Sequence, residues 1–137
     1  MLIVPYDPIW INDFEQIAST LSTTLNGLIC GIEHVGSTSI PNLAAKPIID
    51  IDLVYIEQES FENIKNRLES IGYIHKGNQG MKDREVFKRN LIQNNPILDQ
   101  ISHHLYVCKN NSIELQRHLL FRDYLKKTKQ RKNFIKI

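Results

Sequence analysis

Two aspartates separated by one residue are the pair best suited to chemistry in this 137-residue sequence. Asp50 and Asp52 lie within residues 48–55 (IIDIDLVY), whose β-branched content predicts a strand. Side chains two positions apart on a strand point to the same face, so both carboxylates would converge there. Their mutual repulsion favours a cation between them, and Mg²⁺ commonly binds one or two protein carboxylates together with substrate phosphates. The alternative is the exposed polar face of a one-sided sheet.

A segment of small, hydroxyl-bearing residues lies upstream of the aspartates and directly after a predicted strand at residues 28–35. It consists of Gly36, Ser37, Thr38 and Ser39. Backbone N–H groups and hydroxyls at a strand-to-helix junction can bind phosphate, and Lys46, which follows, could neutralise it. A simple turn with a helix cap explains the segment equally well when it is taken alone. Together with the aspartates it predicts a phosphate-binding loop beside a metal site.

The hydrophobic pattern predicts the elements that position these residues. Helices are expected at residues 9–25, at 57–71 and from Ile113 onward, the last capped by Ser112. Strands are expected at residues 28–35, 48–55, 73–75, 84–89 and 103–108. Residues 40–45 are expected to hold a short helix or an ordered turn, and residues 94–96 a turn. This order predicts one α+β domain over residues 1–137, with a mixed sheet flanked by helices.

Composition excludes several classes of protein. Apolar residues make up 42% and charged residues 23% of the chain, which is typical of a globular protein. Cys30 and Cys108 are too few for a disulfide scaffold, and both are expected to be buried strand residues. Neither a run of about 18 apolar residues nor a signal-peptide pattern is present, so we expect a cytoplasmic protein without a membrane span.

Charge is distributed unevenly along the chain. Residues 1–108 carry 8 basic and 13 acidic side chains, whereas residues 109–137 carry 9 basic and 2 acidic ones. Residues 125–137 contain no acid, and such a basic run has affinity for polyanions, nucleic acid included. However, the run has little aromatic interleaving and matches no recognised nucleic-acid motif. Nucleic acid is therefore not the partner that the sequence favours.

The order of these motifs resembles the nucleotidyltransferase superfamily, with Gly-Ser after the first strand and Asp-x-Asp on the next. Residues 32–51 look like the GrpB family, a branch of that fold. Further blocks resemble the family in order, at residues 6–10, 84–87, 103–107 and 117–125. The resemblance implies a nucleotidyltransferase-like mixed sheet, and fusions of the family's domain to dephospho-coenzyme A kinases point to nucleotide-related metabolism. It also implies that this chain is shortened at its C-terminus, because in the family another helical stretch usually follows this region. A homodimer would cover apolar surface left exposed there.

The resemblance implies a reaction: nucleotidyl transfer, in which two metals held by three carboxylates position a nucleoside triphosphate. It assigns Asp50 and Asp52 to catalysis and Mg²⁺ binding, Gly36 and Ser37 to the phosphates, and a third acid to a neighbouring strand. Residues 103–108 contain no acid. Glu85 lies on another predicted strand but shares its face with Phe87. The alternative function is therefore a non-catalytic binding or regulatory module on the same fold.

Other polar residues are candidates for contact with the phosphate ligand. His34 precedes the glycine, and a hydrogen-bonded structural role is the alternative. Arg84 and His104 are expected to line the cleft, with His103 on the opposite face, although an exposed strand edge also explains Arg84. On the last helix, three basic side chains recur every four residues, at His118, Arg122 and Lys126. That spacing favours a solvent-exposed face, with a local Arg122–Asp123 pair.

Overall fold

A five-stranded mixed sheet organises the computed structural model, which describes residues 2–90 and 95–135, the last seven of these by backbone alone. The strands are β1 (Gly31–Val35), β2 (Ile49–Tyr55), β3 (Tyr73–His75), β4 (Arg84–Arg89) and β5 (His103–Lys109). Their order across the sheet is β1-β2-β5-β4-β3. Strands β2 and β5 are parallel, and every other neighbouring pair is antiparallel. The predicted mixed sheet is therefore confirmed.

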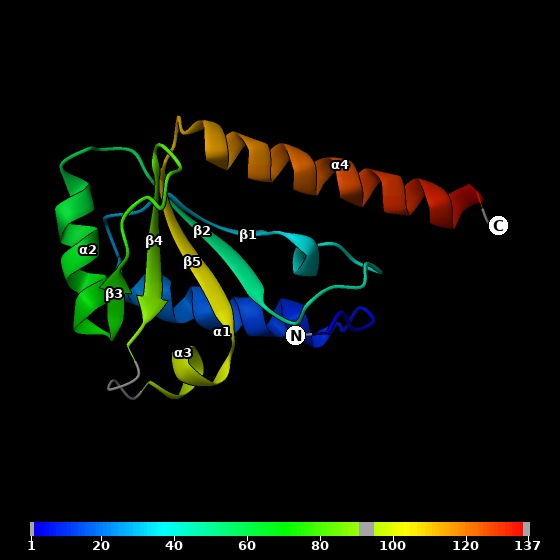
Figure 1. Ribbon diagram of the computed structural model, residues 1–137, viewed down its shortest axis with the longest axis horizontal. Coiled ribbons are helices and arrows are strands. Elements are labelled where there is room, and N and C mark those ends of the chain that lie inside the picture. The colour runs from blue at the N-terminus through cyan, green and yellow to red at the C-terminus, as the bar shows by residue number, and fades with distance from the viewer. Residues whose placement is uncertain (1, 91–94, 136–137) are drawn as a thin grey trace.

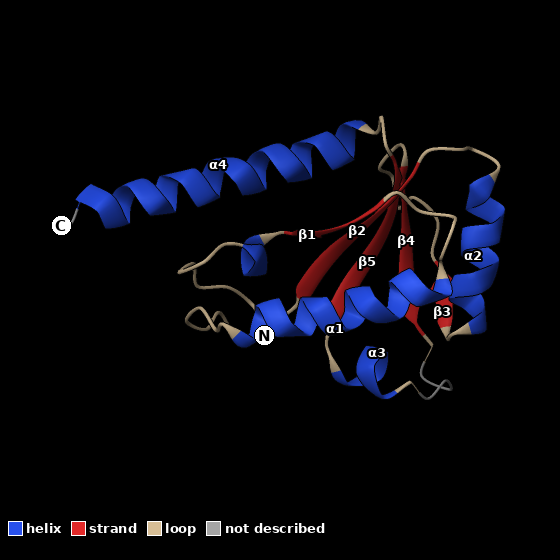
Figure 2. Ribbon diagram, turned by 180° about the vertical axis from the view of Figure 1, so that it is seen from behind, coloured by secondary structure: helices blue, strands red, loops and turns tan. Residues whose placement is uncertain are grey.

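Helices lie on both sides of this sheet (Figure 1). They are α1 (Ile9–Thr24), the 3₁₀ helix η1 (Ser37–Ser39), α2 (Ser60–Ser70), α3 (Pro96–Gln100) and α4 (Ile113–Ile135). Seen from behind in Figure 2, α1 and α4 run on opposite sides of the strands. None of the described helices is both long and apolar enough to cross a membrane. The sheet thus has an α1 side and an α4 side, and the two differ in chemistry.

The α1 side holds the main hydrophobic core. Ile49, Ile51 and Leu53 of β2 are almost completely buried there. They belong to one cluster with residues of the two long helices on that side, among them Ile17, Leu21, Ile64 and Leu68. Alternation along a strand sends the intervening residues of β2 to the other face. The predicted separation of the aspartates from the core-facing residues is therefore confirmed.

A smaller cluster attaches α4 to the other face. Val54 and Cys108 pack there against Leu115, with Leu119 and Tyr106 at its margin. The cap predicted at Ser112 is present, because the backbone N–H of Leu115 donates to Ser112 Oγ at 3.3 Å. Only the first turns of α4 are held in this way, and the helix then runs on beyond the sheet (Figure 1).

Three local expectations were wrong, and one open alternative is decided. The strand predicted from residue 28 begins at Gly31, because Leu28 closes a turn onto Leu25, and Cys30 is exposed rather than buried. Of the two alternatives for residues 40–45, the ordered turn is the one present, because Leu43 N donates to Ile40 O at 3.2 Å, and the 3₁₀ turn η1 lies just before it. The turn predicted around residues 94–96 is instead the start of α3, whose N-cap Asn95 accepts a hydrogen bond from Leu98 N at 3.1 Å; residue 94 lies outside the described residues.

Candidate functional site

Both aspartates of β2 lie on the α4 side of the sheet, but at different depths. The side chain of Asp50 is 28% exposed, whereas that of Asp52 is completely buried. Their partners across the parallel pair are His104 and Tyr106 of β5. The spacing therefore brings two carboxylates to one face, as predicted, with one at the cleft surface and one beneath it.

Asp52 is paired with a residue from α4. His118 Nδ1 lies 2.7 Å from Asp52 Oδ2, and the other carboxylate oxygen, Oδ1, is buried without a hydrogen-bond partner. Burial raises the pKa of Asp52, and the hydrogen bond to the carboxylate raises the pKa of His118. The result is a buried acid–imidazole pair that leaves one acceptor oxygen unused.

Asp50 forms a similar pair nearer to the solvent. His104 Nδ1 lies 2.9 Å from Asp50 Oδ1, and 52% of the His104 side chain is exposed. The hydrogen bond to Asp50 raises the pKa of His104. His103 lies on the opposite face, where Nε2 is 2.7 Å from the Tyr73 hydroxyl. Of the two adjacent histidines, His104 is therefore the one in the cleft, as the sequence predicted.

The loop after β1 lies directly against Asp50. Gly36 has a φ of +74°, and a Cβ built on it would collide with Asp50 Oδ2. Both observations require glycine at this position. The structure thus joins the two sequence motifs, because the backbone of the predicted phosphate-binding loop touches one of the predicted metal ligands.

The hydroxyl groups of the loop have different surroundings. Ser39 Oγ donates to Gly36 O at 2.6 Å, and buried Thr38 donates to Ile48 O at 3.4 Å, so both shape the loop. Ser37 is exposed at the start of η1, where the first backbone N–H groups of a helix have no intrahelical partner. A hollow of about 300 Å³ is lined by Ser37, Lys46, Asp50 and His104 among others. Ser37 and Lys46 are the members of the predicted phosphate-binding set that line this hollow together with the Asp50–His104 pair and buried Thr38.

His34 lies on the α1 side, away from the cleft. Its ring stacks on Phe14 with centroids 4.7 Å apart, and its Nε2 is hydrogen-bonded to Thr38 Oγ1 at 2.9 Å. Burial lowers the pKa of His34 to about 4, so the ring is neutral at neutral pH. The expected phosphate contact is corrected to a positioning role, because His34 fixes the loop through Thr38.

The strands where the sequence predicted a third carboxylate do not supply one to the cleft in the described part of the chain, and the acid beside Asp52 is instead Glu33 of β1, its register partner, which lies 3.3 Å from Arg122 Nη1. Glu85 lies on the α1 side and is bonded to His75 at 2.8 Å, and Tyr106 is the β5 neighbour of Asp52. Across the described part of the chain, no group of three His, Cys, Asp or Glu residues could hold a metal ion. Arg84 does lie on the cleft side, with its guanidinium 4.5 Å above the Tyr106 ring.

The donor set fits one divalent cation better than two. Each aspartate has one oxygen hydrogen-bonded to a histidine, and the buried Oδ1 of Asp52 has no partner. Mg²⁺ prefers oxygen ligands and accepts one or two carboxylates when phosphates and water complete its shell. Two carboxylates are a number that a single Mg²⁺ commonly uses when a phosphate ligand and water complete its shell. A pair of metals held by three protein carboxylates does not fit.

Two residues of α4 were assigned to solvent by sequence reasoning and instead contact the sheet. His118 contacts Asp52, and Arg122 Nη1 lies 3.3 Å from Glu33 and 3.2 Å from His34 O. The predicted Arg122–Asp123 pair is present as well, at 3.0 Å. The four-residue spacing marked a shared helix face, but it could not indicate which side of the helix meets the sheet.

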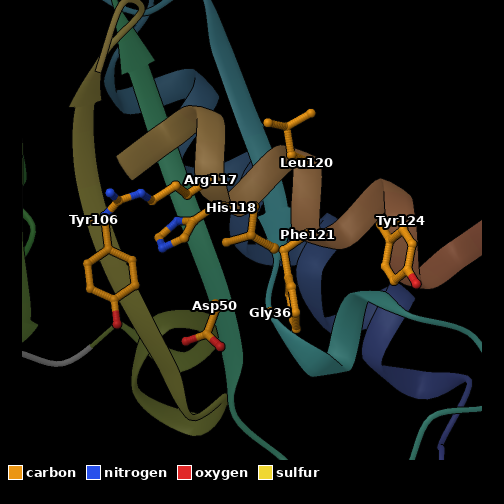
Figure 3. Close-up of a pocket in the computed structure, with 9 residues that line it drawn as sticks. Gly36, Asp50, Tyr106, Arg117, His118, Leu120, Phe121 and Tyr124 are labelled. Carbon is orange, nitrogen blue, oxygen red and sulfur yellow. The ribbon is translucent and has the colours of Figure 1, made fainter. Parts of the chain in front are cut away.

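A cavity of about 640 Å³ lies between the sheet and α4 (Figure 3). It is lined by Val35, Gly36, Asp50, Tyr106, Arg117, His118, Leu120, Phe121 and Tyr124. The α4 wall is largely apolar, and Leu120, Phe121 and Tyr124 are each at least 60% exposed. The opposite wall carries the carboxylate of Asp50. The cavity thus suits a molecule with one apolar part and one cationic part, or a phosphate that binds through a cation held by Asp50.

The GrpB protein family model matches residues 1–134. The chain belongs to the GrpB family. One relative, UPF0157 protein YqkA of Bacillus subtilis, is 33% identical over 124 residues, covering 90% of this chain and 34% of the relative. The chain spans 34–60% of the length of the first three curated relatives it matches.

Solved structures extend this relationship to the fold. The GrpB protein from Enterococcus faecalis is 35% identical and superposes with a TM-score of 0.77, over 92% of this GrpB-family chain and 73% of that protein. Cid1 in complex with the UTP analogue UMPNPP is 16% identical, with a TM-score of 0.59, over 90% and 37% of the two chains. The likeness to Cid1, a poly(U) polymerase, shows the fold alone. The nucleotidyltransferase-like architecture is confirmed.

Proposed function

We propose that this GrpB-family protein binds a nucleotide, or another phosphate-bearing small molecule, together with one Mg²⁺ in the cleft between β2 and α4. The observation that carries the proposal is the contact of the Gly36 backbone with the Asp50 carboxylate, beside a second carboxylate on the same strand. The glycine loop can bind a phosphate and the adjacent carboxylate can bind its counter-ion, so the two would lie next to each other.

The two parts of such a ligand have separate surroundings. Phosphates would lie near Ser37 and Lys46, which share a hollow with Asp50. The remainder of the ligand would lie against the apolar wall of α4 formed by Phe121 and Tyr124. Exposed aromatic rings beside a phosphate site suit a planar base. The nucleotide complex of a structural neighbour, Cid1, supports the proposal by fold only.

A second candidate function is binding without nucleotidyl transfer. It is favoured by β5, on which the family resemblance implies a third acid, because the β5 residue beside Asp52 is Tyr106. Fewer carboxylates hold fewer metal ions, so less positive charge is available to neutralise the phosphates during transfer. The two candidates differ in one measurable product, since transfer from a nucleoside triphosphate releases pyrophosphate and binding alone does not.

Calorimetric titration with nucleoside triphosphates and Mg²⁺ tests the binding proposal. Asp50→Asn should weaken Mg²⁺-dependent binding about tenfold or more, because it removes a carboxylate from the cation. This variant is preferable to one at Asp52, which is completely buried. The proposal is wrong if none of the triphosphates gives heat with Mg²⁺, or if Asp50→Asn binds them as tightly as the wild type.

Gly36→Ala gives a second test with a matched control. Gly36 and Gly27 both have positive φ, at +74° and +83°, so alanine strains the backbone at either position. Only at Gly36 would the added Cβ meet Asp50, since nothing lies within 4 Å at Gly27. We expect Gly36→Ala to lose ligand binding and Gly27→Ala to retain it. Equal losses in the two variants would mean that general destabilisation, rather than the loop–carboxylate contact, is responsible.

A further inference from the structure

A second hollow opens on the β4 side of the aspartates. Its volume is about 520 Å³, and its wall includes Arg84, Lys88, His104 and Tyr106. Arg84 and Lys88 lie on the same face of β4, which the register places on the α4 side of the sheet beside β5. We propose that this hollow binds the phosphate group of a second small-molecule ligand, separate from the ligand in the Gly36 cleft.

Arg84 is held in place, but no acceptor for its guanidinium is found among the described residues. Its guanidinium lies over the Tyr106 ring, and its Nε is buried without a hydrogen-bond partner. The other arginines whose side chains the structure describes all donate to an oxygen. They are Arg67 to Thr24 O, Arg89 to Asp99, Arg117 to Glu114 and Arg122 to Glu33. A stacked guanidinium with unused donors is a preorganised receptor for an oxyanion.

Lys88 adds a second positive charge to the wall of the hollow. A rise of about 3.3 Å per residue places its Cα about 13 Å from that of Arg84, so the two side chains bracket a ligand larger than one phosphate. The acidic residue in the wall is Asp99, and it is already paired with Arg89 at 2.8 Å. The charge left to a ligand is therefore positive.

The aspartates separate two anion-binding regions. Ser37 and Lys46 belong to the β1 side, whereas Arg84 and Lys88 belong to β4, and the strand order β1-β2-β5-β4 places Asp50 between them. Two regions on opposite sides of one carboxylate suit two phosphate-bearing ligands. The volume and the small number of charges favour a phosphomonoester over a nucleic-acid strand. If the ligand at Arg84 is a co-substrate of the nucleotide in the Gly36 cleft, that role rests on the proposed function. Anion binding at Arg84 does not depend on the proposed function.

Titration of the full chain with methyl phosphate in the absence of Mg²⁺ tests the site, using chemical-shift changes or heat as the readout. Arg84→Gln should weaken binding about tenfold, and Lys88→Gln by about threefold. Lys76→Gln removes an equal charge from an exposed position outside the hollow and should change affinity less than twofold. Arg84→Lys should bind methyl phosphate more tightly than Arg84→Gln but more weakly than the wild type. Lysine keeps the positive charge but lacks the paired N–H donors of the guanidinium.

The outcomes separate this site from the proposed function. Loss of methyl phosphate binding in Lys46→Gln with none in Arg84→Gln would overturn the second site and leave triphosphate binding untouched. Equal losses in Arg84→Gln and Lys76→Gln would also overturn it, because general electrostatics would then suffice. An Arg84-dependent oligonucleotide affinity far above that for methyl phosphate would overturn the small-molecule assignment. Arg84-dependent binding of methyl phosphate without any triphosphate binding would support the site while the proposed function fails.

Discussion

Two pairs of histidines, one pair on each side of the sheet, have opposite electrostatic surroundings. On the α1 side, His34 stacks on Phe14 and His103 bonds to Tyr73, and burial lowers the pKa of both imidazoles. On the α4 side, hydrogen bonds to the aspartates raise the pKa of His104 and of His118. The surroundings of His34 and His103 therefore favour the neutral imidazole, whereas those of His104 and His118 favour the protonated one.

The difference shows what a carboxylate changes at a partly buried position. Burial disfavours the charged imidazole, and a hydrogen-bonded carboxylate outweighs this penalty. The α4 side thus favours the protonated forms of the two imidazoles that contact Asp50 and Asp52. A bound Mg²⁺ would have to share these carboxylates with His104 and His118, which agrees with the fit of one ion rather than two.

His118→Ala should have the largest effect on stability. The substitution leaves the completely buried Asp52 without its partner, and removal of one member of a buried pair costs about 3 kcal/mol or more. Urea denaturation at pH 7 measures the loss. A loss below about 1 kcal/mol would contradict the assignment of Asp52 as a buried charge that depends on His118.

A double-mutant cycle serves as the control for this prediction. If the two residues act as a pair, His118→Ala combined with Asp52→Asn should cost less than the sum of the single losses. Strict additivity would mean that His118 stabilises α4 by packing alone. The neighbouring contacts of Leu115 and Leu119 are retained in all variants, so they do not affect the comparison.

Alternation along β2 is the reason why much of this site was predictable from sequence. Ile49, Ile51 and Leu53 could only be buried together, which placed Asp50 and Asp52 together on the other face. The same reasoning separated His103 from His104. Strand alternation is a local property, and it needs no knowledge of what packs against either face.

The contacts of α4 were not predictable in this way. The sequence places His118 and Arg122 on one helix face, but whether that face meets solvent or the sheet depends on the small cluster around Leu115. The side of β1 occupied by His34 likewise followed only once the strand was paired with β2. Local pattern therefore determined the faces of single strands, and tertiary packing determined which faces met.

The pH dependence of the free energy of unfolding should show the contribution of His34. We expect this effect to be smaller than that of His118→Ala. His34 has a pKa of about 4 in the folded protein and an ordinary value of 6.5, so the unfolded chain binds more protons between these values. The contribution of the neutral ring is complete above pH 6.5 and is lost as the pH falls toward 4. Denaturation of the wild type and of His34→Gln at pH 7.5 and pH 4.5 measures it. The stability advantage of the wild type should shrink at pH 4.5; an unchanged advantage would contradict a neutral, buried His34.

His104→Ala should have the smallest effect on stability, although His104 forms the same type of pair as His118. Both side chains of the His104–Asp50 pair remain partly exposed, at 52% and 28%, and exposed ion pairs contribute about 0–1 kcal/mol and are screened by salt. Urea denaturation in low and high salt should show a small loss that declines with salt. A loss of stability as large as that of His118→Ala would mean that burial does not explain the difference between the His104–Asp50 and His118–Asp52 pairs. A small, salt-sensitive loss would leave Asp50 as the carboxylate that a cation can reach at least cost to the fold.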